Sequence, residues 1–146
     1  MGTNPSARRD PAFPVESLDY GQAEDFARRL GWLTGLQVRL PLTEELVAAH
    51  QADGRAIPSA EAWTLDTAEG KVRPAGTSRP NPAGIHDLRG NVAEWAMAQD
   101  GSPTAPVVGG DAQSIPEGQA LGVDRVGKTE TSRLRGFRVV VVSESR

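Results

Sequence analysis

Asn91 and Glu94 form the most specific chemical pattern in the sequence. The segment that begins at Asn91 predicts a short helical turn, on which residues three apart share one face. The Asn91 amide oxygen and the Glu94 carboxylate would then converge and, with backbone carbonyls, supply the oxygen ligands that Ca²⁺ prefers. Asp87 would add negative charge nearby. The same spacing also fits a capping box without a metal, with Asn91 as N-cap and Glu94 at the third helical position.

The two histidines could be ligands or bases, but their settings favour structural roles. His86 lies between Ile85 and Asp87, and we expect a half-buried, hydrogen-bonded ring there. His50 lies late in a predicted helix, where we expect it to face solvent.

Other catalytic classes have no motif in this sequence. Serine, histidine and aspartate occur, but no G-x-S-x-G elbow frames a nucleophile. The glycines match neither of the common nucleotide-binding patterns, so no nucleotide cofactor is expected. Cysteine is absent from the chain. That absence excludes disulfides, thiolate nucleophiles, cysteine-ligated zinc and thiolate copper sites.

Length and charge restrict the partners further. The chain has 146 residues, enough for one domain with a real core. Its formal net charge of −3 leaves no basic footprint for nucleic acid. The longest apolar run, Val139–Val142, is far shorter than the roughly 20 residues that span a bilayer, so no membrane partner is expected. Residues 1–10 contain no apolar h-region, which favours the cytoplasm over secretion.

Hydrophobic periodicity predicts two helices early in the chain. The first runs from about Leu18 to Leu30, with its apolar residues on one stripe and Gly31 as its end. The second runs from about Thr43 to Ala52, with Thr43 as its N-cap and acidic residues in its first turn.

Short strands and long loops are predicted for the rest of the chain. We expect strands at 37–40, at 62–65 and 71–73 as a possible hairpin, at 107–108 and at 133–142. Residues 1–13 are interpreted as a disordered leader ahead of a single domain, residues 14–146. Two helices followed by short antiparallel strands and long loops are typical of an α+β fold.

Residues 111–128 are predicted to form a long surface loop with polar side chains that suit adaptable recognition. The candidate ligand-binding residues are Asp111, Gln113, Ser114, Glu117 and Arg125. A plain solvated loop is the alternative interpretation.

Three larger side chains are expected to belong to the interior. Trp63 and Trp95 should fill the core beneath the loops. Arg138, next to the valine run, is the arginine that we expect to be buried and paired, with Glu94 or Asp87 as its candidate partners.

Four stretches, in order, resemble the formylglycine-generating-enzyme-like (sulfatase-modifying-factor) family. Residues 80–95 are close to that family's "PNPFGLYDMHGNVWEW" motif and carry most of the resemblance. Residues 135–139 match its terminal "RGFRVV" strand, residues 39–49 are similar to "RLPTEAEWEYA", and residues 14–26 look like the opening of its first helix. The resemblance implies a C-type-lectin-like fold and a structural calcium near Asn91.

The departures from the family pattern bear on activity. The resemblance implies two copper-binding cysteines before the final strand, and this chain has none. We therefore expect no copper and a non-catalytic module that binds a protein, peptide or small-molecule ligand, as a sensor or interaction domain within a larger bacterial signalling or defence protein. One alternative is a metal-dependent oxidoreductase-like enzyme completed by a missing segment or partner chain, and another is a purely structural subunit.

Overall fold

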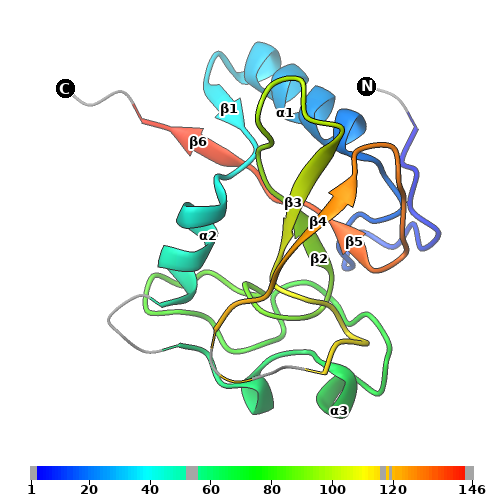
Figure 1. Ribbon diagram of the computed structural model, residues 1–146, viewed down its shortest axis with the longest axis vertical. Coiled ribbons are helices and arrows are strands. Elements are labelled where there is room, and N and C mark those ends of the chain that lie inside the picture. The colour runs from blue at the N-terminus through cyan, green and yellow to red at the C-terminus, as the bar shows by residue number, and fades with distance from the viewer. Residues whose placement is uncertain (1–2, 52–55, 116–117, 119, 144–146) are drawn as a thin grey trace.

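The structure is a computed structural model that describes residues 3–51, 56–115, 118 and 120–143. A long helix, α1 (Tyr20–Thr34), lies at one end beside a ribbon of β1 (Gln37–Arg39) and β6 (Val140–Val142) (Figure 1). A four-stranded sheet occupies the middle, and loops with the short helix α3 (Leu65–Ala68) form the other end. The fold is α+β, as predicted. Within the described residues no helix is long and apolar enough to cross a bilayer.

The first helix is longer than the sequence predicts. Its start is fixed by a capping box, in which Asp19 accepts from the Gln22 amide at 2.8 Å and the Gln22 side chain accepts from the Asp19 amide at 2.9 Å. Gly31 does not end it. A Cβ at position 31 would lie 2.9 Å from the Leu36 carbonyl oxygen, so glycine permits close packing inside the helix. The helix ends instead at Gly35, whose φ of 70° is the left-handed cap conformation.

The second helix, α2 (Thr43–His50), is capped one residue earlier than predicted. Leu42, not Thr43, is the N-cap, and its amide donates to the Glu45 carboxylate at 2.8 Å. Glu45 also receives two hydrogen bonds from Arg39, at 2.7 and 2.8 Å. Ala52, the predicted end of this helix, lies outside the described residues. Glu45 thus fastens the start of α2 to β1.

Stability should depend on the ionisation of Glu45. The Arg39 guanidinium lowers the pKa of the Glu45 carboxyl to about 2. A carboxyl with a lowered folded-state pKa contributes stability above its ordinary value of 4.5, and that stability is lost as the pH falls towards 2. Because the side chain is 36% exposed, we expect only about 1 kcal/mol at pH 7 after allowing for solvent screening.

The expected outcome is that Glu45→Gln lowers the free energy of unfolding at neutral pH but matches the wild type near pH 2. Urea unfolding at a series of pH values measures the difference. Glu44→Gln is the matched control, because Glu44 is exposed on the same helical turn and forms no ion pair with any residue that the structure describes. A deficit of constant size between pH 7 and pH 2 would contradict the assigned role.

The central sheet has the strand order β4 (Val123–Gly127), β3 (Thr104–Val108), β2 (Ala93–Trp95) and β5 (Arg135–Gly136). β3 pairs antiparallel with β2 and β4, as expected. The β2–β5 pairing is parallel, which corrects the expectation of antiparallel strands throughout. β2 lies between β3 and β5 in the sheet, and every one of its residues is buried.

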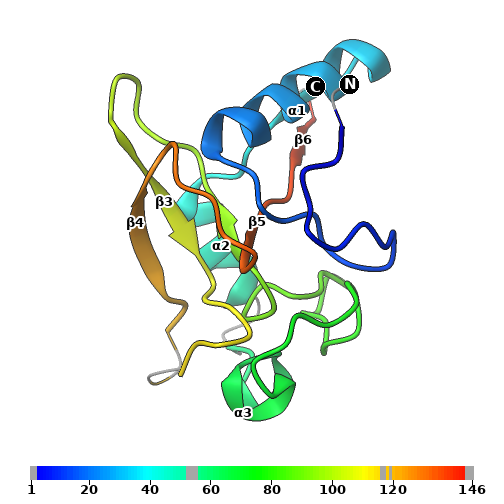
Figure 2. The same ribbon diagram turned by 90° about the vertical axis from the view of Figure 1, so that its right-hand side faces the viewer.

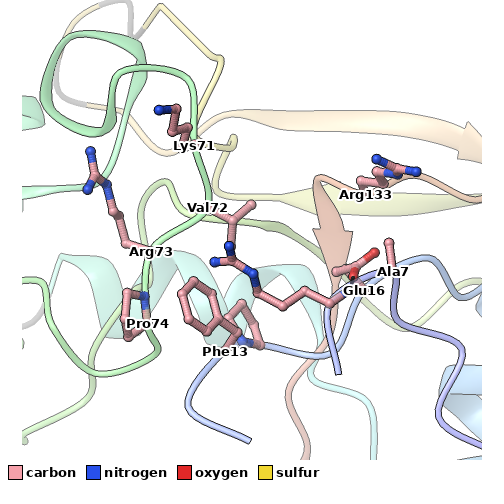
Figure 3. Close-up of a pocket in the computed structure, with 10 residues that line it drawn as sticks. Ala7, Phe13, Glu16, Lys71, Val72, Arg73, Pro74 and Arg133 are labelled. Atoms are coloured by element: carbon pink, nitrogen blue, oxygen red, sulfur yellow. Dashed lines mark hydrogen bonds between the residues drawn. The ribbon is translucent and has the colours of Figure 1, made fainter. Parts of the chain in front are cut away.

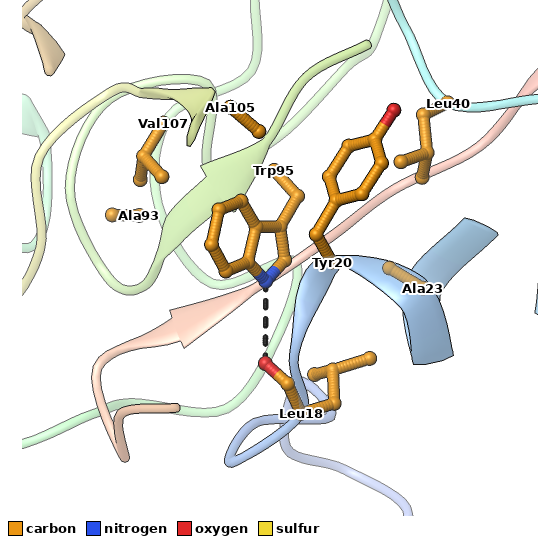
Figure 4. Close-up of a cluster of buried hydrophobic side chains, with 8 residues drawn as sticks. All are labelled: Leu18, Tyr20, Ala23, Leu40, Ala93, Trp95, Ala105 and Val107. Carbon is orange, nitrogen blue, oxygen red and sulfur yellow. Dashed lines mark hydrogen bonds between the residues drawn. The ribbon is translucent and has the colours of Figure 1, made fainter. Parts of the chain in front are cut away.

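Trp95 is the centre of the main core and is fully buried, as predicted. Its indole nitrogen donates to the Leu18 carbonyl oxygen at 3.2 Å, and Tyr20 meets its ring edge-on with centroids 5.8 Å apart (Figure 4). A second core cluster, which includes Leu46 and Val108, lies beneath the loops. Trp63 is only half-buried, and its indole nitrogen donates to the Thr77 hydroxyl.

Three segments have other structures than the sequence predicts. The hairpin of 62–65 with 71–73 is absent; a 3₁₀ turn η2 (Ser59–Glu61) and α3 stand there, and Trp63 forms an isolated bridge with Gly90. The loop at 111–128 contains β4. The strand at 133–142 is divided into β5 and β6, which belong to different sheets.

Residues 3–13, for which the sequence predicts a disordered leader, hydrogen-bond to later parts of the chain at two points. The buried Ser6 hydroxyl accepts from the Glu16 amide at 3.0 Å, and the Ala12 carbonyl accepts from the Ala75 amide at 2.8 Å. Figure 2 shows this segment on the β5 side of the sheet, opposite β3 and β4. The sequence does not indicate this contact, because hydrogen bonds from backbone amides do not require a pattern of hydrophobic side chains.

His50 is buried, which contradicts the expectation of a solvent-facing ring. Neither ring nitrogen has a hydrogen-bond partner in the described part of the chain. Burial lowers the pKa of His50, so the neutral imidazole is the favoured form.

Candidate functional site

Asn91 connects three segments through its backbone and side chain. It has a φ of 65°, so the chain reaches β2 through a left-handed residue instead of the predicted helical turn. Its side-chain oxygen accepts from the Arg73 amide at 2.9 Å, and its side-chain nitrogen donates to the Arg73 carbonyl at 3.1 Å. Its backbone amide donates to Trp63, and its carbonyl accepts from Ala112. The Asn91 amide group therefore acts like one residue of an extra strand.

Glu94 is the partner of Arg138, one of the two that the sequence suggested. The Arg138 Nε and Nη2 atoms donate to the two carboxylate oxygens at 2.6 and 2.7 Å, and Nη2 also donates to the His86 carbonyl at 3.0 Å. Burial raises the pKa of the Glu94 carboxyl, and the Arg138 guanidinium opposes that rise. This bidentate pair joins β2 to the segment between β5 and β6.

The arrangement does not support a cation at Asn91 and Glu94. The helical turn that would bring their oxygens together is replaced by a strand, and each side chain already serves protein partners. Asp87 accepts from Ser78 and from the Gly76 amide. Among the described residues no three histidine, aspartate or glutamate side chains gather as ligands. Calcium therefore stays a prediction without support at this pair.

His86 has the structural setting that the sequence predicts. Its ring is half-buried, and Nδ1 donates to the Ser78 carbonyl at 2.7 Å. This bond orients the ring, while the His86 carbonyl accepts from Arg138.

Three of the predicted ligand-binding residues lie together. Asp111 and Ser114 form a compact turn, in which the Ser114 hydroxyl accepts from the Asp111 amide at 2.9 Å and donates to the Asp111 carboxylate at 3.2 Å. Gln113 donates to the Gly70 carbonyl at 3.3 Å. Arg125 is not part of this group, because it lies on β4 and donates to Thr104 near the other end of β3. Glu117 lies outside the described residues.

Asp111 and Ser114 line a cleft of about 360 Å³, which we call the loop-face cleft. Its polar lining includes Thr64, Arg89, Asp111, Ser114 and Asp124, with Ile115 and Leu121 among the apolar residues. Ile115 is 74% exposed, which is unusual for an isoleucine side chain. The cleft thus combines carboxylates, a hydroxyl and an exposed apolar side chain.

Arg89 is the residue of this cleft that sequence reasoning missed. Only 5% exposed, it donates to the Ile57 carbonyl at 3.0 Å and to the Gly118 carbonyl at 2.8 Å. Burial lowers the pKa of Arg89. A single arginine between Leu88 and Gly90 gives no sequence signal of burial, so its role as a tie between two loops appears only in three dimensions.

The chain matches the family model of the sulfatase-modifying factor enzyme 1-like domain over residues 1–141. The match includes the whole N-terminal segment, residues 1–13. No curated protein sequence is significantly similar to the chain.

Several solved structures share the fold. PvdO from Pseudomonas aeruginosa is 20% identical with a TM-score of 0.79, over 92% of this chain and 64% of that one. CarF is 18% identical with a TM-score of 0.75, over 94% of this chain and 70% of that one. Treponema denticola variable protein 1 is 18% identical with a TM-score of 0.79, over 95% and 77%. The chain thus spans somewhat less than two thirds of PvdO, and these likenesses concern the fold alone.

Proposed function

Because the chain belongs to the sulfatase-modifying factor enzyme 1-like family, we propose that it is a non-catalytic binding module built on that family's fold. The observation that carries the proposal is the loop-face cleft, where residues selected from the sequence for recognition, Asp111 and Ser114, lie together. The proposed occupant is a peptide segment of a partner protein or of another domain.

The charges of the cleft define the class of peptide. Asp111 and Asp124 place two carboxylates at the cleft against one guanidinium, that of Arg89, so the charged lining is net negative. A basic side chain on the ligand would complement these carboxylates. Ile115 offers an apolar contact next to them. We therefore propose a peptide that carries a basic residue beside an apolar one.

The donor set of the chain supports binding over oxidation. The copper centre that the family resemblance implies needs cysteine ligands, and the sequence contains no cysteine. The cleft is lined by hydroxyl, carboxylate and guanidinium groups, none of which is a soft ligand for copper(I). The residues present therefore do not fit that metal.

A peptide titration followed by NMR of the ¹⁵N-labelled chain tests the proposal. We expect acetyl-Lys-Leu-amide to shift the amides of residues 109–115 and 121–124, and acetyl-Glu-Leu-amide to leave them unchanged. The double variant Asp111→Asn with Asp124→Asn should weaken binding about fivefold or more, since asparagine keeps the hydrogen-bond acceptor but loses the charge. Asp66→Asn is the matched control, because Asp66 is exposed on α3 and lies outside the cleft.

Two outcomes would overturn the proposal. Equal shifts with the acidic peptide would remove the charge argument. Oxygen consumption that depends on the chain, with copper(I), dithiothreitol and a cysteine-containing peptide, would establish the alternative, a metal-dependent oxidoreductase.

A further inference from the structure

A second cavity, of about 520 Å³, lies where the N-terminal segment meets residues 71–74 (Figure 3). We call it the basic pocket. Figure 3 shows Lys71 and Arg73 on one side, Arg133 on the other, and Phe13 on the wall between them. Its described lining shares no residue with the loop-face cleft.

The walls of the basic pocket are held in place by the fold. Ser6 and the backbone amide of Arg8 both hydrogen-bond to Glu16, at 3.0 Å each. The bond from the Ala75 amide to the Ala12 carbonyl closes the N-terminal segment onto the segment that follows Pro74. A cavity with such walls is largely preformed, and its volume lies within the range of small-molecule sites.

Positive charge predominates in this pocket. Its lining contains Arg8, Lys71, Arg73 and Arg133 but only one carboxylate, Glu16. None of these five forms an ion pair within the described residues.

The single carboxylate is committed to other partners. Glu16 is 4% exposed and accepts from the Arg8 amide and from the Ser17 hydroxyl. Both donors are neutral, and the four cationic side chains outnumber the one carboxylate, so the lining of the pocket is net positive.

The four cations differ in what they already contact. Arg73 donates to the Ala68 carbonyl at 2.9 Å and lies 5.6 Å from the Trp63 ring, so it has a structural role as well. Arg8 stacks over the Phe13 ring at 4.0 Å. Lys71 and Arg133 are exposed, and no hydrogen bond of either side chain is seen within the described residues. These last two are the cations most available to a ligand.

We propose that the basic pocket binds a small organic phosphate, a dianion attached to a flat apolar body. Arginine and lysine around one cavity attract such an oxyanion, and arginine matches its geometry with paired donors. Phe13 and the prolines Pro14 and Pro74 supply the surface against which the apolar body would pack. The assignment does not depend on the peptide proposed for the loop-face cleft.

Four probes separate the contributions of charge and apolar surface. Isothermal titration calorimetry with phenyl phosphate, inorganic phosphate, benzoate and benzamide should give the tightest binding for phenyl phosphate. Inorganic phosphate should bind about tenfold more weakly, because it lacks the ring. Benzamide should not bind measurably. Raising the ionic strength to about 0.15 M should weaken phenyl phosphate binding.

Single substitutions locate the site. Lys71→Gln and Arg133→Gln should each weaken phenyl phosphate binding about fivefold, while Arg9→Gln, the exposed neighbour outside the pocket, should leave it unchanged. Phe13→Leu should weaken phenyl phosphate but not inorganic phosphate. Melting temperatures of all variants show that they are folded.

Contrary results are equally specific. Equal affinity for phenyl and inorganic phosphate would overturn the organic ligand, because the apolar wall would then contribute nothing. Lys71→Gln and Arg133→Gln variants that bind as tightly as Arg9→Gln would overturn the site itself.

Discussion

Arg138→Met should destabilise the fold by about 3–5 kcal/mol, because it leaves the Glu94 carboxylate buried without its guanidinium partner. The Glu94 side chain is 9% exposed, and two hydrogen bonds at 2.6 and 2.7 Å disappear with the arginine. The His86 carbonyl loses a donor as well. Urea unfolding of the two proteins at pH 7 measures the difference in free energy.

Arg39→Met is the matched control for this result. Arg39 also makes a bidentate pair with a glutamate, but Glu45 is 36% exposed, so the same substitution should cost about 1 kcal/mol or less. The double variant Glu94→Met with Arg138→Met should recover most of the loss, since no charge is then left buried. Similar losses for Arg138→Met and Arg39→Met would show that burial does not set the strength of the pair.

The Arg138→Met variant should also gain stability relative to wild type in acid. Burial raises the pKa of the Glu94 carboxyl above its ordinary 4.5, and in the variant no guanidinium opposes this rise. A group with a raised folded-state pKa favours folding at low pH, and that contribution is lost as the pH rises through the folded pKa. The deficit should therefore be largest at neutral pH and shrink as Glu94 becomes protonated.

Gly90→Ala should destabilise the protein by about 4 kcal/mol or more, enough to prevent stable folding. Gly90 has a φ of 77°, and a Cβ at this position would lie 2.2 Å from the Trp63 carbonyl oxygen. That oxygen accepts the Asn91 amide at 2.7 Å, while the Gly90 amide donates to Gly109. The backbone cannot withdraw without breaking the contacts that bring β2 to the loops.

Gly76→Ala separates backbone strain from steric conflict. Gly76 also has a φ of 77°, but nothing lies within 4 Å of the position of its Cβ. Alanine there should cost only about 1–2 kcal/mol, the penalty for a left-handed residue. Soluble yield and thermal unfolding of both variants provide the comparison, and equal losses would contradict the close packing at Gly90.

The two long helices were predictable because their signals are local. The residues that form the apolar stripe of α1 are close together in the sequence, and so are the acidic residues in the first turn of α2. Their ends were less predictable. Gly31 resembles a terminal glycine, yet its lack of a side chain serves packing against Leu36, a contact that no local pattern encodes.

The predicted helical turn after Asn91 is wrong, because this segment forms the strand β2, and a short apolar run fits a buried strand as well as a helix. β2 has only three residues, Ala93, Glu94 and Trp95, and all are buried, so the strand is too short for its pattern to distinguish it from a helical turn. The Gly90–Asn91 pair was the available signal, since both residues tolerate a left-handed backbone that a helix start does not use. The calcium hypothesis rested on this helical interpretation together with the family resemblance.

The candidate sites were likewise predictable only where their residues are close together in the sequence. Asp111 and Ser114 were found because they belong to one polar stretch. The basic pocket was not found, because its charges come from three distant segments of a chain whose overall charge is negative. The expected pairing of Arg138 is confirmed with Glu94, one of its two candidate partners, but the arginine side chain is 26% exposed and not buried as predicted.

The pairing of β5 and β6 with strands much earlier in the sequence has a consequence for folding. β6 pairs with β1, and β5 pairs with β2, so neither sheet is complete until residues 135–142 are in place. Until β6 and β5 form, β1 has no partner strand and β2 is paired on one side only, with β3. A chain truncated before Arg135 should therefore expose the unpaired edges of β1 and β2 and should aggregate more readily than the whole domain.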